Sequence, residues 1–184
     1  MNGHTIYKKI SCTILLVGAI ALGLGFTSIT FSQAQRNPVL EFSTGTWCQW
    51  CPCGDQAAQD ILAEIPNAII LAYHGPPNSS YDPFSFFAGN TIIYAFDFPG
   101  YPTGVVDRLT GIVDYFYGGW AFSMNIRLNV PATVSIDLVN SSYERATREF
   151  NATIDFTALQ NLSGEYKYSA ILVEDGVVYG QSSN

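Results

Sequence analysis

The chain has 184 residues, of which 48% are hydrophobic and 12% charged, and its formal net charge is −7. This apolar content is enough for a sizeable buried core, so disorder is excluded as a general description of the chain. The acidic balance argues against nucleic acid or an anionic membrane as a partner.

The first 34 residues have the layout of a secretory signal peptide. Lys8 and Lys9 precede the uncharged run 10–26, and small residues stand at Ser32 and Ala34, the two positions that a signal peptidase reads. We predict a cleaved signal peptide at 1–34 and export to the periplasm, the outer membrane surface or the extracellular space. The alternative is an uncleaved anchor, but the strongly apolar stretch 14–26 is shorter than the roughly 20 residues that span a bilayer.

The next segment predicts a strand, a helix and a second strand. Residues 38–43 form a short apolar run that is typical of a buried strand. Apolar residues recur at helical spacing over 49–64, and Pro66 closes that segment. Residues 68–73 are apolar without polar alternation, which predicts a central parallel strand that is covered on both faces. This order is a βαβ unit.

A second unit follows an insertion. Residues 75–100 begin with Pro, Gly, Asn and Ser and then become aromatic, so we expect an insertion that contains a helix. Valines at 105 and 106 and the pair Ile112 and Val113 flank a turn and predict a hairpin, and residues 120–128 predict a closing helix. The fold class is therefore α/β, with a βαβ unit followed by a ββα unit over 35–129.

The pattern changes after Pro131. Apolar and polar residues alternate over 134–138, 150–156 and 168–172, which predicts half-buried antiparallel strands. Three or four such strands within 130–184 make only an incomplete antiparallel β-sandwich. We therefore expect a β-rich segment at 130–184 and a truncated C-terminus.

Cys48 and Cys51 carry the main chemical signal. Cysteines three apart at a helix start share one face, and the helix N-terminus stabilises a thiolate. We predict that Cys48 is the exposed nucleophile and that Cys51 resolves the mixed disulfide. Outside the cytosol the pair is a disulfide candidate, and the alternative is a static structural disulfide, although so short a loop gains little from closure.

Cys53 raises a second alternative. Three cysteines within six positions also suit a metal or copper(I) site, because thiolates are soft ligands. On a helix, however, Cys53 and Cys51 lie about 200 degrees apart, and no histidine close in sequence completes a tetrahedral set. We therefore predict no metal and no cofactor.

These motifs carry a resemblance to a known superfamily. Trp-Cys-x-x-Cys-Pro at 47–52, followed by Tyr-Pro-Thr at 101–103, resembles the thioredoxin superfamily over 39–128. The longer stretches 43–52, 100–103 with Asp107 and Arg108, and 172–176 are similar to the twenty-eight-kilodalton outer-membrane-protein-related family of Gram-negative bacteria. Members of that family are similar to thioredoxins and continue into a β-rich region. The resemblance implies a minimal thioredoxin-like fold.

The resemblance also implies roles for residues around the cysteines. Pro102 takes the place of the cis-proline against which the substrate backbone pairs, and Tyr101 precedes it. Glu41 takes the place of a buried acid that relays protons, and its alternative is an exposed carboxylate at a strand end. Two further sets of side chains are predicted from their positions: His74, for proton transfer or as a loop histidine, and the flanking Trp47 and Trp50, for binding substrate. For the tryptophans, the alternative is that Trp47 packs under the loop and only Trp50 is exposed.

The sequence thus predicts an exported thiol-disulfide oxidoreductase. Its partners would be protein thiols or disulfides and an unidentified redox partner, with membrane association only through the signal segment or a missing C-terminal region. The alternative is a non-catalytic cell-surface or outer-membrane-associated binding protein that uses the thioredoxin-like scaffold with an inert disulfide. Direction of exchange does not follow from the Gln49-Trp50 dipeptide, so reductant, oxidant and isomerase stay open.

Overall fold

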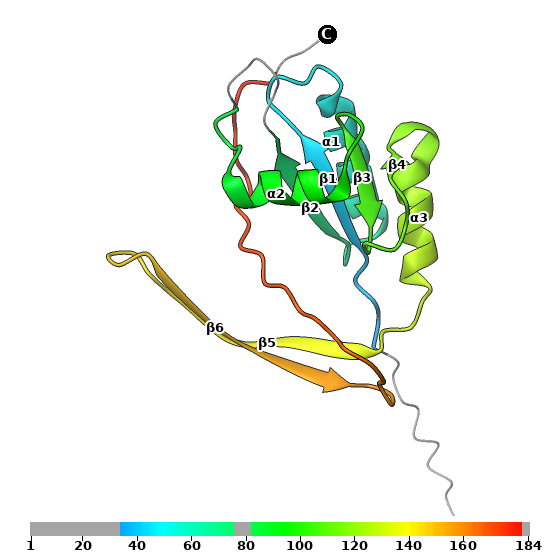
Figure 1. The fold of residues 1–184 in the computed structure, drawn as a ribbon, viewed down its shortest axis with the longest axis vertical. Helices are drawn as coiled ribbons and strands as arrows, with labels where there is room; N and C mark the ends of the chain where they lie inside the picture. The colour runs from blue at the N-terminus through cyan, green and yellow to red at the C-terminus, as the bar shows by residue number, and fades with distance from the viewer. Residues whose placement is uncertain (1–33, 76–81, 182–184) are drawn as a thin grey trace, which may run out of the picture. The chain divides into compact units, whose positions relative to one another are not determined.

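A computed structural model describes residues 34–75 and 82–181 of the chain (Figure 1). The predicted signal peptide at 1–34 lies outside these residues except for Ala34. In the described ranges the protein has mixed α/β structure, and the elements follow one another as β1 (Val39–Thr44), α1 (Cys51–Glu64), β2 (Ile69–His74), α2 (Phe87–Phe96), β3 (Thr103–Val106), β4 (Val113–Asp114), the short 3-10 helix η1 (Phe116–Gly118), α3 (Gly119–Leu128), β5 (Val134–Glu144) and β6 (Glu149–Ala158).

The first four strands form one sheet in the order β2-β1-β3-β4 within the part of the chain that the structure describes. Strand β1 pairs in parallel with β2, in a register that joins Thr44 to His74, and it pairs antiparallel with β3. Strand β4 then pairs antiparallel with β3. The predicted order of βαβ followed by ββα, with a helix inserted between the two units, is the order observed.

One strand lies in a different place from the one predicted. Strand β2 pairs in parallel with β1, as predicted, but it is at the edge of the sheet and β1 is central, so the prediction of a central strand at 68–73 was wrong. Its side chains are also less covered than predicted. Ile69, for example, is 42% exposed, whereas five of the six residues of β1 are buried. A continuous apolar run does not by itself distinguish a central strand from an edge strand, because strand order depends on pairing with distant segments.

The core lies on the face of the sheet that α1 and α3 cover. Leu40 and Phe42 of β1 point to this side and pack against the apolar faces of both helices, and the core consists of Leu40, Phe42, Ala58, Ile61, Ile65, Val106, Trp120 and Met124. The Phe42 and Trp120 rings lie 4.9 Å apart. Helix α2 contacts β2, and Figure 1 shows it on the opposite side of the sheet from α1 and α3. Because side chains alternate along a strand, Glu41 points away from the α1 side.

The polar turn after β3 is anchored by Asp107. Its carboxylate accepts hydrogen bonds from Val39 N at 2.8 Å, from Arg127 Nε at 2.7 Å and from Arg36 Nη1 at 3.2 Å. These three donors belong to β1, α3 and the segment before β1. Asp107 therefore ties the beginning of the sheet to the last helix of the α/β region.

Strands β5 and β6 form a separate two-stranded antiparallel sheet. Its register shifts between Leu138 and Asn140, which marks a bulge at Val139. The alternating strands over 134–138 and 150–156 were predicted correctly, but Ile136 is 65% exposed and both strands are mostly exposed, so they are not half-buried as predicted. The strand predicted over 168–172 is absent among the described residues, because this segment pairs with neither strand.

Candidate functional site

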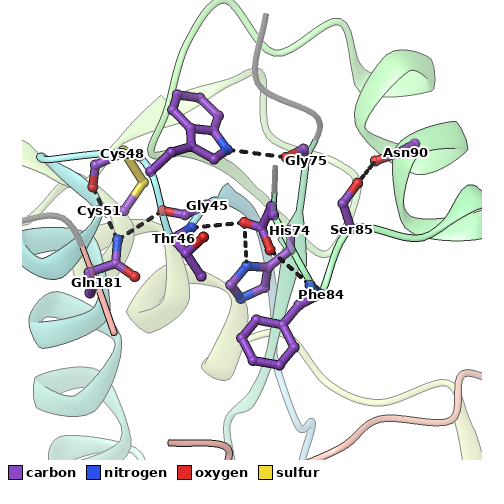
Figure 2. A network of polar contacts seen from close by, with 12 residues as sticks. Gly45, Thr46, Cys48, Cys51, His74, Gly75, Phe84, Ser85, Asn90 and Gln181 are labelled. Atoms are coloured by element: carbon purple, nitrogen blue, oxygen red, sulfur yellow. Dashed lines mark hydrogen bonds and ion pairs between the residues drawn. A yellow bond between two sulfur atoms is a disulfide. The ribbon is translucent and has the colours of Figure 1, made fainter. Parts of the chain in front are cut away.

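Cys48 and Cys51 form a disulfide at the start of α1, with their Cα atoms 5.4 Å apart (Figure 2). Strand β1 ends at Thr44, and a turn in which Cys48 N donates to Gly45 O at 3.0 Å brings Cys48 to the helix. Cys51 is the first residue of α1, and Pro52 follows it in the first turn, where a backbone N–H is not needed. The sulfurs therefore lie at the positive end of the helix dipole, which favours a thiolate.

Both cysteines are buried. Cys51 has no exposed surface and Cys48 is 5% exposed, so the prediction that Cys48 is an exposed nucleophile was wrong. Tyr101 O lies 3.7 Å from Cys48 Sγ. Sequence spacing placed both cysteines on one helix face, but it contained no information on the segments that pack around them.

Tyr101 and Pro102 lie beside the disulfide, and the peptide bond between them is cis. Pro102 packs directly on helix α1 at Gly54, one turn after Cys51. A Cβ atom built at Gly54 would lie 2.7 Å from Pro102 Cγ, which is closer than real Cβ contacts. Gly54 is thus the residue that lets α1 approach Pro102, and the sequence analysis missed it because nothing local marks a glycine for long-range contact.

A cleft of about 330 Å³ lies next to Pro102. Aromatic side chains form much of its wall, and Trp50 is 52% exposed there. The segment before β3 forms one side and the segment between β4 and α3 the other, with the lining residues Trp50, Pro99, Gly100, Tyr101, Pro102, Thr103, Asp114, Tyr115 and Phe116. The structure therefore brings the predicted residues Trp50, Tyr101 and Pro102 together, and it adds Tyr115 and Phe116, which the sequence analysis did not select.

Trp47 has a different environment from Trp50. Its indole Nε1 donates to Gly75 O at 3.4 Å, and its ring lies 5.1 Å from the ring of Tyr101. It does not line the cleft described above. Trp47 therefore supports the loop from the side of β2, and Trp50 is the exposed tryptophan beside the cysteines, which corresponds to the alternative arrangement considered for the pair.

Glu41 is held in a buried ion pair. It is 2% exposed, and its carboxylate receives Arg108 Nε and Nη2, each at 2.7 Å, together with Tyr73 Oη at 2.8 Å. The exposed carboxylate that was considered as the alternative for Glu41 is therefore wrong. Burial raises the pKa of Tyr73, and its hydrogen bond to Glu41 raises it further.

The position of Glu41 bears on the predicted proton relay. Glu41 lies on the face of the sheet opposite α1, and the Arg108 guanidinium that binds it also lies 5.4 Å from the ring centre of Phe96 in α2. The structure thus gives this carboxylate one ion-pair partner, on the α2 side, and the described residues show no hydrogen bond or ion pair between it and the disulfide. The proton-transfer role of Glu41 stays a prediction.

His74 ends β2 and pairs with a buried acid that was not predicted. Its Nδ1 lies 3.0 Å from Oδ2 of Asp82, whose carboxylate also accepts Thr46 N at 2.8 Å and Phe84 N at 2.9 Å (Figure 2). Burial by itself raises the pKa of Asp82, but hydrogen bonds from His74, Thr46 and Phe84 outweigh it, so the pKa lies below its ordinary value. Asp82 lies eight positions after His74, and no sequence motif marks it.

A glutamine far along the chain completes this part of the site. Gln181 Nε2 donates to Gly45 O at 2.8 Å and to Cys48 O at 3.1 Å, and Figure 2 shows its side chain beside the disulfide turn. Nearby, the rings of Tyr179 and Phe84 lie 5.3 Å apart. The segment around 179–181 therefore contacts the turn that presents Cys48, a relationship across more than 130 positions that no sequence pattern indicates.

Cys53 is exposed on α1 and is not part of the disulfide. It acts on Tyr115 in the cleft wall, whose pKa is raised first by burial and second by the charge of Cys53. Among residues 34–75 and 82–181, no three His, Cys, Asp or Glu side chains gather in a way that could hold a metal ion. Cys53 therefore lies close to the cleft without belonging to the cysteine pair.

Comparisons with models of protein families, with curated proteins and with solved structures find no match to this chain. Within the described ranges, no helix has the length and apolar character needed to cross a membrane.

Proposed function

We propose that this protein is an exported thiol-disulfide oxidoreductase that exchanges disulfides with protein thiols through Cys48 and Cys51. The observation that carries the proposal is the position of the disulfide. It lies at the N-terminus of α1, and Tyr101 O faces Cys48 Sγ at the edge of an aromatic cleft. A helix N-terminus lowers the pKa of a thiol placed there, and an adjacent cleft can hold the chain that carries the partner thiol.

The exchange needs no cofactor. A substrate thiolate attacks Cys48 Sγ, the bond between Cys48 and Cys51 breaks, and Cys51 leaves as a thiolate that takes up a proton. A second substrate thiolate then attacks the substrate sulfur of the mixed disulfide, forms the substrate disulfide and releases the Cys48 thiolate, which also takes up a proton. The substrate has lost two electrons and two protons, and the cysteine pair has gained them. The reverse sequence reduces a substrate disulfide, and an unidentified redox partner would restore the pair.

The topology of the α/β region supports a thioredoxin-like assignment. Parallel β1 and β2 are joined through α1, antiparallel β3 and β4 precede α3, and Pro102 stands at the start of β3. We propose on this basis that the region over 35–129 is a thioredoxin-like domain. We also propose membership of the twenty-eight-kilodalton outer-membrane-protein-related family, which rests on the sequence motifs, and export, which rests on the signal layout at 1–34.

A direct test uses the mature full-length protein with Cys53→Ser, so that the free thiol does not react. We expect this protein to reduce insulin or to oxidise a dithiol peptide. Cys51→Ser in the same background should trap a mixed disulfide with a peptide that carries a disulfide, because the Cys48 thiolate attacks that disulfide, one peptide sulfur leaves as a thiolate, and no second cysteine resolves the product. Cys48→Ser is the matched control and should trap none. If the background protein does neither reaction and Cys51→Ser traps nothing, the catalytic proposal fails.

The burial of both cysteines favours a second candidate function. Cys48 is 5% exposed, and Gln181 binds the carbonyl groups of its turn. In this alternative the protein is a cell-surface or outer-membrane-associated binding protein whose disulfide is structural. A redox titration separates the two functions, since exchange-active pairs lie between roughly −270 and −120 mV and structural disulfides lie below about −300 mV.

A further inference from the structure

The carboxylate of Asp82 is buried, and the exchange chemistry described above does not use it. Its side chain has no exposed surface. Taking a carboxylate out of water is costly unless hydrogen bonds and charges compensate it. Here Thr46 N and His74 Nδ1 both lie within 3.0 Å of Oδ2, and Phe84 N lies 2.9 Å from Oδ1 (Figure 2). The three donors account for both carboxylate oxygens.

The donor that matters for function is Thr46. It stands two residues before Cys48, inside the turn in which Cys48 N donates to Gly45 O. Thr46 is itself buried, and a buried N–H needs an acceptor, which Asp82 Oδ2 provides at 2.8 Å. The hydrogen bond from Thr46 to Asp82 therefore fixes the backbone of the turn from outside, immediately before the cysteine that faces Tyr101 O.

His74 connects this carboxylate to the sheet. It is the last residue of β2 and lies opposite Thr44 in the parallel register with β1, so its backbone is held in place by the sheet. Its ring is also held at the edge of the Phe84 ring, with centres 5.1 Å apart. An Nδ1–H group that donates to Asp82 orients the carboxylate toward Thr46, whether the imidazole is neutral or protonated.

We propose that Asp82 is a positioning residue for Cys48, acting through Thr46, and that His74 is a positioning residue for Asp82. The inference rests on the proposed function, since it concerns the same exchange reaction. Asp82 and His74 transfer no proton to sulfur in this scheme. They keep the turn in the geometry in which an incoming thiolate, Cys48 Sγ and Cys51 Sγ can align, and misplacement of a reacting atom by about 1 Å costs on the order of 100-fold in rate.

The test is Asp82→Asn in the full mature chain with Cys53→Ser. The amide has the same size but only one acceptor oxygen, so either Phe84 N at the Oδ1 position or both Thr46 N and His74 Nδ1 at the Oδ2 position lose their acceptor. Any hydrogen bond that remains also loses the negative charge of its acceptor and weakens. We expect the second-order rate of disulfide reduction by glutathione to fall between about 10-fold and 100-fold. Binding of a peptide whose cysteine is replaced by serine should not change, because the cleft residues are untouched. Asp55→Asn, an exposed acid of α1 whose charge also acts on His74, is the matched control and should retain the background rate.

His74→Gln provides a second, independent variant. It should slow glutathione reduction less than Asp82→Asn does, and the double variant should be no slower than Asp82→Asn alone, because both substitutions act through one carboxylate. The backbone amide of Thr46 should shift in the ¹⁵N spectrum in both single variants and not in Asp55→Asn. If Asp82→Asn fails to fold, His74→Gln with an unchanged unfolding midpoint and a slower exchange rate supports the proposal on its own.

Several outcomes would overturn the inference. One is a folded Asp82→Asn variant that reacts at the background rate. Another is a double variant whose loss of exchange rate equals the two single losses combined, which would mean that His74 acts independently of Asp82. A third is a parallel loss of peptide binding and reaction rate, which would indicate a general structural effect. If the background protein itself does not exchange with glutathione or peptide thiols, the proposed function fails first, and this result is distinct from the other three.

Discussion

Gly54 of α1 and Pro102 at the start of β3 are in such close contact that residue 54 has no room for a side chain. A Cβ atom there would lie 2.7 Å from Pro102 Cγ and 3.0 Å from Pro102 Cβ. The contact joins the helix that carries Cys51 to the segment that lines the cleft. It is therefore the point at which the spacing between disulfide and cleft is set.

Gly54→Ala should destabilise the protein and slow exchange. Overpacking a tight contact costs about 1–3 kcal/mol, and the better helix propensity of alanine returns up to about 1 kcal/mol, so we expect a net loss of roughly 1–2 kcal/mol. Urea unfolding and the rate of mixed-disulfide formation measure the two effects. Gly111→Ala is the control, since a methyl group there meets nothing within 4 Å and Gly111 does not line the cleft. Equal stability of the two variants would contradict the packing argument.

Arg108→Ala should destabilise the α/β region by leaving the Glu41 carboxylate buried without its cation. Breaking a buried pair costs about 3–5 kcal/mol, but the Arg108 side chain is 48% exposed and partly screened, so we expect about 2 kcal/mol. The free energy of unfolding in urea measures this loss. Lys167→Ala removes an exposed pair with Glu165 at 3.6 Å and should change stability by less than about 0.5 kcal/mol. A similar effect of both substitutions would argue against a buried pair at Glu41.

Stability should fall with rising pH above about 10 because of Tyr73. Burial, followed by the hydrogen bond to Glu41, raises the pKa of Tyr73 in the folded protein above its ordinary value of about 10. The native state therefore keeps a proton that the unfolded chain loses, and its stabilising contribution, complete below pH 10, declines as the pH rises toward the folded-state pKa. Unfolding midpoints at pH 9, 10 and 11 measure the slope. Tyr73→Phe should be less stable at pH 9 and show a flatter decline, and an unchanged slope would exclude Tyr73 as the cause.

Trp50→Ala should weaken exchange with peptides while leaving exchange with small thiols intact. Trp50 is exposed at the cleft, so its loss removes contact area for a bound chain but leaves the disulfide in place. Loss of one aromatic anchor costs about 1–2 kcal/mol in binding, which is roughly a 5- to 30-fold change. The measurement is the rate of exchange with a cysteine peptide divided by the rate with glutathione, compared between the protein with Trp50 and the Trp50→Ala variant. Phe122→Ala, an exposed aromatic of α3 that does not line the cleft, should leave both rates unchanged.

Much of the α/β region could be predicted from local patterns. Strands β1 and β2 and helix α1 were predicted within about two residues of their observed bounds. The patterns that predicted them are the apolar run before Cys48, the helical spacing after Cys51 and Pro66, which ends the helix. The hairpin and the closing helix α3 were also predicted, since each has its own period or turn residues. The prediction of a further strand over 168–172, after β6, was wrong. Alternation shows that a segment can form a strand but not that a partner strand is present.

Local patterns are enough to predict the elements of the α/β region and the pairing of Cys48 with Cys51, because helical and strand periods and the three-residue cysteine spacing act within one short segment. Tertiary packing, in contrast, makes β2 an edge strand, buries Cys48 and brings Gly54 against Pro102. It alone also brought Asp82 to Thr46 across 36 positions. The physical reason is that burial and hydrogen-bond partners depend on which distant segments pack together, and neither period nor spacing within a segment contains that information.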